Sequence, residues 1–176
     1  MVDFALVEGD GRLDFDIPEG GLEDLRKHDA IYFGAVGSAD VPDHTSLWGL
    51  RLAITQPFDQ WANIRPVTFL PGVESPLRKA DDTDLDWIVV RENSEGEYAG
   101  MGGRNLSGRG PGNEVALQTS LHTEKGTERI IRFAFDLART RPVKKVSSVT
   151  KSNAQQYGMV LWDEVFARVA ADYPDV

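Results

Sequence analysis

Apolar runs with the character of strands, alternating with segments of helical period, constrain the fold of this chain most strongly. The runs cover residues 30–37, 63–70, 85–90 and 143–150, and most of them end abruptly at a glycine or a polar residue. A continuous run such as AIYFGAVG (30–37) is typical of a strand buried on both faces. Strands that alternate with helices predict the α/β class.

The predicted helices lie before and between these runs. A short helix opens at Pro18 with Leu22 and Leu25 on one face, and Ser46 is a good N-cap for a helix over 47–55. Thr123 or Thr127 caps the next helix, whose apolar stripe is Ile130, Phe133, Ala134, Leu137 and Ala138. The last helix covers 154–173, and its inward residues are Trp162, Val165, Phe166 and Val169.

Glycines crowd residues 99–113, between two segments that alternate well enough to be strands. This stretch lacks the Lys-Ser/Thr ending of a phosphate-binding P-loop, and no helix follows it directly. We therefore expect the tip of a β-hairpin here, with strands at 95–101 and 114–122. A connection rich in proline, glycine and charge is expected at 71–84.

Composition excludes several classes of protein. The formal charge of −9 disfavours nucleic acid and anionic membranes as partners, and the absence of cysteine excludes disulfides and thiolate chemistry. The N-terminus lacks the basic and apolar regions of a signal peptide and no stretch approaches a membrane span, so we expect a cytoplasmic protein. His28, His44 and His122 have no mutual spacing typical of metal ligands.

Three cations and one phenol stand at the ends of separate strand-like segments: Arg65, Arg91, Tyr98 and Lys151. Guanidinium groups bind carboxylates in bidentate fashion, while lysine and tyrosine can exchange protons with a substrate. If the fold gathers them, they suit a small dicarboxylate. Each has an ordinary structural explanation when taken alone: a strand-end arginine, a half-buried tyrosine, a solvated lysine.

The segments around these residues resemble the β-decarboxylating dehydrogenases, the family of isopropylmalate, isocitrate, D-malate and tartrate dehydrogenases. The matching segments include HTSLWGLRLAITQPFDQWANIRP (44–66), DWIVVRENSEGEYAG (86–100) and SVTKSNAQQYGMVLWDEVF (148–166), and their wording is most similar to the tartrate and D-malate branch. The resemblance implies a partial isopropylmalate-dehydrogenase-like α/β fold, with a mixed sheet flanked by helices and a protruding hairpin arm at about 96–122. Residues 1–60 would belong to a nucleotide-side domain, and 61–176 to a substrate and dimerisation domain.

The same resemblance implies a role for each candidate residue. Arg65 and Arg91 would bind the substrate carboxylates. Tyr98 would protonate the enolate that forms when carbon dioxide leaves, and Lys151 would take part in removing the proton of the substrate hydroxyl. Asn153 would contact the cofactor or the substrate. The implied reaction is the oxidation of a malate-type 2-hydroxy dicarboxylate by NAD, with decarboxylation.

Arg51 is a less certain member of this set. The family's first substrate arginine falls at Thr55, so the expected cation is missing there. Arg51 precedes it by four residues, one helical turn away on the same face, and its longer side chain would partly replace the missing group. The other interpretation is an arginine that extends from an apolar helix to water.

Part of the family's machinery has no counterpart in this sequence. The aspartates that bind Mg²⁺ or Mn²⁺ and the adenosine-binding loop follow, in the family, beyond the TKSN strand and its helix. We therefore expect a fragment of such an enzyme, which the resemblance implies to be a homodimer. The alternatives are a catalytically incompetent fragment that serves as a dimerisation module, and a protein that only binds small anions.

Overall fold

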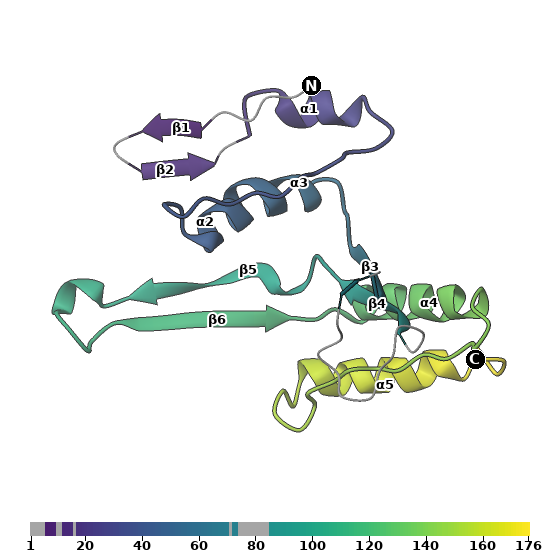
Figure 1. Ribbon diagram of the computed structural model, residues 1–176. Helices are drawn as coiled ribbons and strands as arrows, with labels where there is room; N and C mark the ends of the chain where they lie inside the picture. Colours follow the sequence, from purple (N-terminus) through teal and green to yellow (C-terminus); the bar gives the residue numbers. More distant parts are fainter. Residues whose placement is uncertain (1–5, 10–11, 16, 71, 74–84) are drawn as a thin grey trace. The chain divides into compact units, whose positions relative to one another are not determined.

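The structure is a computed structural model that describes residues 6–9, 12–15, 17–70, 72–73 and 85–176. The chain divides into two compact units, Met1–Gln60 and Trp61–Val176. Helices and strands occur together in the described residues (Figure 1), which confirms the α/β class. Most of the connection expected at 71–84 lies outside the described residues.

The first unit packs two helical segments around a small core. β1 (Leu6–Gly9) and β2 (Arg12–Phe15) pair in antiparallel fashion, and α1 follows at Gly21–Arg26. A second helical stretch consists of α2 (Asp43–Ser46), the π-helical η1 (Leu47–Leu52) and α3 (Ala53–Thr55). The buried residues of the core are Leu25, Leu50 and Ile54.

Two predictions for this unit are wrong. Ser46 does not cap a helix, because the helix already begins at Asp43 after Pro42, and the Ser46 hydroxyl donates to the Asp43 carbonyl (3.1 Å). Residues 30–37 form no strand, and Tyr32 is fully exposed. A strand requires a neighbour for its backbone N–H and C=O groups. The described part of the chain places no strand beside this segment.

In the second unit, a two-stranded ribbon lies on a long helix. β3 (Ala62–Thr68) and β4 (Asp86–Glu92) pair in antiparallel fashion, as strands were predicted at both places. Ala62 and Val90 pack against the core cluster, which contains Ile130 and Ile131 of α4 (Glu124–Arg139). One face of the ribbon therefore covers α4, and the side chains of the opposite face point away from this core.

α4 begins at the predicted cap, but its buried face is broader than the predicted stripe. The Thr123 hydroxyl accepts a hydrogen bond from the Gly126 N–H (2.9 Å), as an N-cap does. Ile131 and Phe135 are buried, whereas Phe133 is only partly covered and meets the edge of Trp61. The reason is that two partners, the β3–β4 ribbon and α5, cover neighbouring sides of one helix.

The last helix, α5 (Gly158–Ala170), turns the predicted residues inward. Val165 and Val169 are fully buried, and Trp162 and Phe166 pack against the same cluster. The strand predicted at 143–150 is absent, although the segment has the alternating burial of one: Val146 and Ser148 are half-buried, and their neighbours are exposed. No described strand lies beside it to form a ladder. The described sheets are therefore all antiparallel.

β5 (Gly96–Asn105) and β6 (Val115–Leu121) form the predicted hairpin arm, with a short 3₁₀ turn, η2 (Ser107–Arg109), at its tip. The register pairs Gly103 with Leu117 and Asn105 with Val115, so both apolar residues share one face. That face also carries Met101, and all three apolar side chains are exposed (45–69%). An exposed apolar face of this kind is typical of a contact surface.

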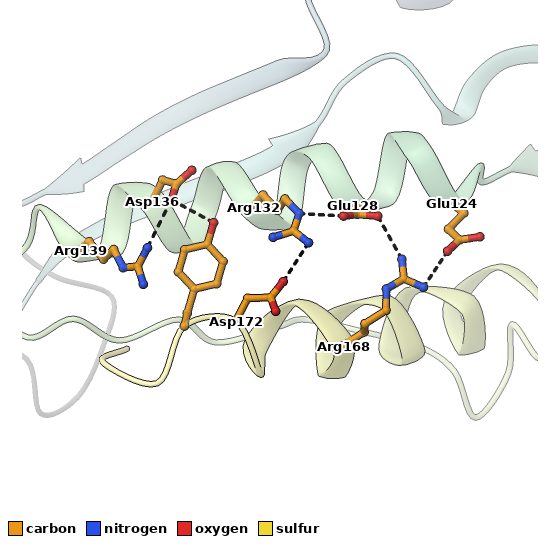
Figure 2. A network of polar contacts seen from close by, with 8 residues as sticks. Glu124, Glu128, Arg132, Asp136, Arg139, Arg168 and Asp172 are labelled. Carbon is orange, nitrogen blue, oxygen red and sulfur yellow. Dashed lines mark hydrogen bonds and ion pairs between the residues drawn. The ribbon is translucent and has the colours of Figure 1, made fainter.

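Ion pairs connect α4 to α5 along their exposed sides (Figure 2). Arg168 donates to Glu124 (2.6 Å) and Glu128 (3.0 Å), while Arg132 bridges Glu128 (2.7 Å) and Asp172 (2.9 Å). Two residues that follow α5 also contact α4. Asp175 accepts from Arg139 at 2.7 Å, and the Tyr173 hydroxyl donates to Asp136 at 2.9 Å. Single exposed pairs contribute little, but a connected series holds two helices in one register.

Acid should weaken this network. The hydrogen bond from Arg132 holds the pKa of Glu128 below its ordinary 4.5, and the one from Arg139 holds the pKa of Asp175 below 3.8. A carboxyl with a lowered pKa in the folded state binds fewer protons there than in the unfolded chain. Its contribution to stability is therefore complete above the ordinary pKa and is lost as the pH falls through the folded value.

We expect the urea midpoint of unfolding to decrease between about pH 5 and about pH 3. The control is the Glu128→Gln, Asp175→Asn double variant, whose midpoint should be lower at pH 7 and should change less over the same range. An identical pH dependence in the two proteins would show that other carboxyl groups determine the acid response.

Candidate active site

Arg65 and Arg91 lie on the same face of the β3–β4 ribbon. The register pairs Asn63 with Arg91 and Arg65 with Val89. Directly paired residues share a face, as do residues two apart along a strand. These four side chains therefore occupy the face opposite to the one that covers α4. Two guanidinium groups that are 26 residues apart in the sequence are thus brought to one surface.

Two asparagines connect Arg65 to the end of β4. The Arg65 Nε donates to the Asn63 Oδ1 at 2.9 Å, and the Asn63 Nδ2 lies 3.5 Å from the Asn93 Oδ1. Asn93 is buried (6% exposed), and its backbone N–H donates to the Trp61 carbonyl at 2.8 Å. The Arg65 side chain is therefore held by groups of the ribbon itself.

Tyr98 lies beside Arg91. The guanidinium carbon of Arg91 is 4.8 Å from the centre of the Tyr98 ring, the geometry of a cation–π contact. Both side chains are half-buried. The structure therefore brings together three of the predicted residues: Arg65 and Arg91 by strand register, and Tyr98 by direct contact with Arg91.

A tight turn between β4 and β5 carries Tyr98 to this place. The Glu92 carboxylate accepts hydrogen bonds from the Ser94 N–H (3.0 Å), the Ser94 hydroxyl (2.6 Å) and the Glu95 N–H (2.6 Å). Arg129 of α4 donates to the same hydroxyl at 2.8 Å. Gly96 follows with φ +66°, a conformation that favours glycine.

Sequence reasoning missed the supporting residues of this site: Asn63, Glu92, Asn93 and Ser94. Glu92 and Ser94 are adjacent to predicted strand ends, but nothing in their spacing distinguishes a turn carboxylate from a solvated one. Asn63 could have been found only through the register, because its role depends on its position two residues before Arg65 and opposite Arg91.

Lys151 and Asn153 are not part of this cluster. Both are exposed, and the Lys151 ammonium makes no hydrogen bond or ion pair within the described part of one chain. The Lys151 carbonyl instead accepts from the N–H groups of Ala154 (3.0 Å) and Gln155 (2.9 Å) in the turn that leads to α5.

Arg51 belongs to the first unit, on η1, and is half-buried. Thr55, where a cation was expected, ends α3, and its hydroxyl oxygen is buried.

Among the described residues, no three histidine, aspartate or glutamate side chains gather as a metal site would require. Asp163 is half-buried on α5 and Glu164 is exposed. His122 shares a hydrogen bond with Ser120 at 3.0 Å. Of the helices described, none combines the length and the apolar character needed to cross a membrane.

Comparisons with known proteins agree on one family. A family model described as isocitrate/isopropylmalate dehydrogenase matches residues 6–176. The chain is 57% identical over 160 residues to a probable tartrate dehydrogenase/decarboxylase of Agrobacterium vitis, covering 91% of this chain and 44% of the relative. It is 48% identical over 161 residues to the decarboxylating D-malate dehydrogenase of Escherichia coli, with coverage of 91% and 44%.

A solved structure, the isocitrate dehydrogenase from Methylococcus capsulatus, matches 90% of this chain and 44% of its own length, with a TM-score of 0.66 and 26% identity. The chain thus spans less than half the length of these relatives, and its fold is partial relative to theirs. The family match extends over nearly all of the sequence, including both arginines, Tyr98 and Lys151. The chain therefore belongs to the isocitrate/isopropylmalate dehydrogenase family.

Proposed function

We propose that this chain supplies the substrate-binding and proton-transfer groups for the oxidative decarboxylation of a malate-type 2-hydroxy dicarboxylate such as D-malate, tartrate or 3-isopropylmalate. The observation that carries the proposal is the common face of Arg65 and Arg91, with Tyr98 beside Arg91. The names of the tartrate and D-malate relatives support this substrate class. The second unit, from residue 61, would be the substrate domain, and the first the nucleotide-side domain.

Each arginine would bind one carboxylate of the substrate. Arg65 and Arg91 are diagonal neighbours across the ribbon, and residues in such an arrangement lie about 7–8 Å apart. Their guanidinium groups can therefore meet two carboxylates of one small molecule. For Arg51, on η1, the proposal is carboxylate binding alone.

Tyr98 and Lys151 would transfer the protons. The Tyr98 hydroxyl would protonate the carbon that loses carbon dioxide, while Lys151 would accept the proton of the substrate hydroxyl through its Nζ. We assign Lys151 to the site of a second copy of the chain. Its lack of contact with Arg91 within the described part of one copy is consistent with that assignment.

The complete reaction also requires NAD as the hydride acceptor and a divalent metal, Mg²⁺ or Mn²⁺, to polarise the forming carbonyl. The residues described here do not fit a metal site, since no suitable cluster of carboxylates or imidazoles is present among them. Asn153, the expected cofactor contact, is exposed. The roles proposed for this chain are therefore limited to carboxylate binding and proton transfer.

The hairpin arm supports a second proposed function, the assembly of a homodimer, which is compatible with the first. The exposed apolar side chains of Met101, Val115 and Leu117 share one face of a hairpin that is exposed along both strands. If the chain cannot turn over substrate by itself, this surface would make it a dimerisation module.

Replacement of Lys151 by alanine tests the enzyme proposal. In an assay with NAD, Mn²⁺ and each of the three acids, we expect any NADH formation seen with the wild type to be lost in Lys151→Ala, because the proton acceptor is removed. The measurement is absorbance at the NADH band. Lys125→Ala, an exposed lysine on α4, is the control and should retain the rate. No turnover of any acid by the wild type would instead favour the dimerisation module.

Replacement of Arg91 by lysine tests carboxylate binding. A hydrogen bond to a charged group contributes about 1.5–3 kcal/mol, so loss of the fork should raise KM at least tenfold while kcat changes less. Steady-state kinetics with the preferred acid measure both constants. Arg109→Lys at the tip of the arm should leave KM unchanged. An unaltered KM in Arg91→Lys would mean that Arg91 does not bind the substrate.

Replacement of Leu117 by aspartate tests the dimer. A charge on the apolar face of the arm should convert the dimer to a monomer, because the carboxylate would be desolvated at the interface. Sedimentation equilibrium gives the mass, and circular dichroism shows whether the fold is retained. Ala116→Asp places the same charge on the opposite face and should remain dimeric. A dimer that withstands Leu117→Asp would not be built on this face.

A further inference from the structure

The segment that leads to Lys151 lacks the support expected of a strand. Residues 145–149 have no regular secondary structure, and no described strand forms a ladder with them. Val146 packs against the core cluster, whereas Ser147 and Val149 face solvent. The position of Lys151 must therefore be fixed by contacts other than a sheet.

One side-chain hydrogen bond attaches this segment to α5. The Trp162 Nε1 donates to the Ser148 Oγ at 3.0 Å, in a half-buried environment. Among the described residues, this is the only side-chain hydrogen bond made by residues 145–149. Trp162 is itself held, because its helix buries Val165 and Val169 completely and its own ring packs against the same core.

The turn beyond Ser148 carries this constraint to Lys151. The Thr150 Oγ1 accepts from the Ser152 N–H at 3.3 Å. The Lys151 carbonyl accepts from the N–H groups of Ala154 and Gln155, at 3.0 and 2.9 Å, just before α5 begins. Lys151 thus stands three residues after the Trp162 contact and at the start of a hydrogen-bonded turn.

We propose that Trp162 and Ser148 are positioning residues for Lys151. The proposal rests on the proton-transfer role given to Lys151 under the proposed function. The accepting atom of a base must lie within about 2.6–3.2 Å of the heavy atom that carries the proton, and an error of about 1 Å can reduce a rate by about 100-fold. The hydrogen bond from the indole ties Ser148 to α5, so that the side chain of Lys151, three residues further on, starts from a defined point.

Two neighbouring serines provide a matched experiment. Ser148→Ala removes the acceptor of the indole N–H, whereas Ser147→Ala makes the same chemical change on the exposed side. Ser148→Thr keeps a hydroxyl at the same place. Two readouts apply to all three variants: hydrogen exchange of the Ala154 and Gln155 amides, and kcat and KM across a range of pH.

We expect Ser148→Ala to accelerate exchange at Ala154 and Gln155 several-fold and to lower kcat about tenfold. KM should remain within twofold, since the arginines are untouched, and the pH profile of kcat should change because Lys151 is displaced. Exchange at Val165 and Val169 should not change. Ser147→Ala should resemble the wild type, and Ser148→Thr should restore most of the loss.

Equal behaviour of Ser148→Ala and Ser147→Ala would overturn the proposal. So would faster exchange at Val165 and Val169 together with the turn, because the hydrogen bond would then support the whole helix rather than position Lys151. If the wild type shows no turnover, the proposed function fails, but the exchange data still decide whether Ser148 holds the turn. Trp162→Phe removes the donor of the same hydrogen bond. The double variant Trp162→Phe, Ser148→Ala should therefore lose no more kcat than Trp162→Phe alone.

Discussion

A shift of one residue between β3 and β4 would place Arg65 and Arg91 on opposite faces of the ribbon. In the observed register, Ala62 and Val90 contact the core beneath, while Arg65 and Arg91 occupy the opposite face. Because side chains alternate along a strand, a slip would turn one of the two arginines toward α4 and expose the apolar residues of the same strand. Burial of the ribbon on α4 and the arrangement of the candidate site therefore depend on the same backbone hydrogen bonds.

Two acidic residues at and after the end of β4 stabilise the architecture. The Glu92 carboxylate binds the turn that follows it. Glu95 extends to the start of α4, where its carboxylate accepts from the Thr123 N–H (2.8 Å) and hydroxyl (2.5 Å). A negative charge is favourable at this end of a helix. A Cβ at Gly126 would overlap the Glu95 carboxylate, so a larger residue there would displace this carboxylate from Thr123. The segment that carries Tyr98 is thus attached to the helix beneath the ribbon.

Elements with their own local signal could be predicted from the sequence. The apolar stripe and cap of α4, the inward residues of α5 and the glycine-rich tip of the hairpin all follow from short-range patterns. The runs at 30–37 and 143–150 were predicted as strands for the same reason, but a strand also needs a neighbour, and apolar periodicity says nothing about which segment supplies it. The shared face of Arg65 and Arg91 likewise depends on a register between distant segments, and the support from Asn63 follows from that register.

The hydrogen bond between Arg65 and Asn63 restricts how an acid can approach. With Nε engaged at 2.9 Å, the side edge of the guanidinium is occupied, and the two terminal amino groups remain for an incoming molecule. A carboxylate must then arrive end-on and nearly coplanar with the guanidinium. For the carboxylate binding proposed for Arg65, an uncharged amide would thereby set the direction in which the rest of the bound molecule extends.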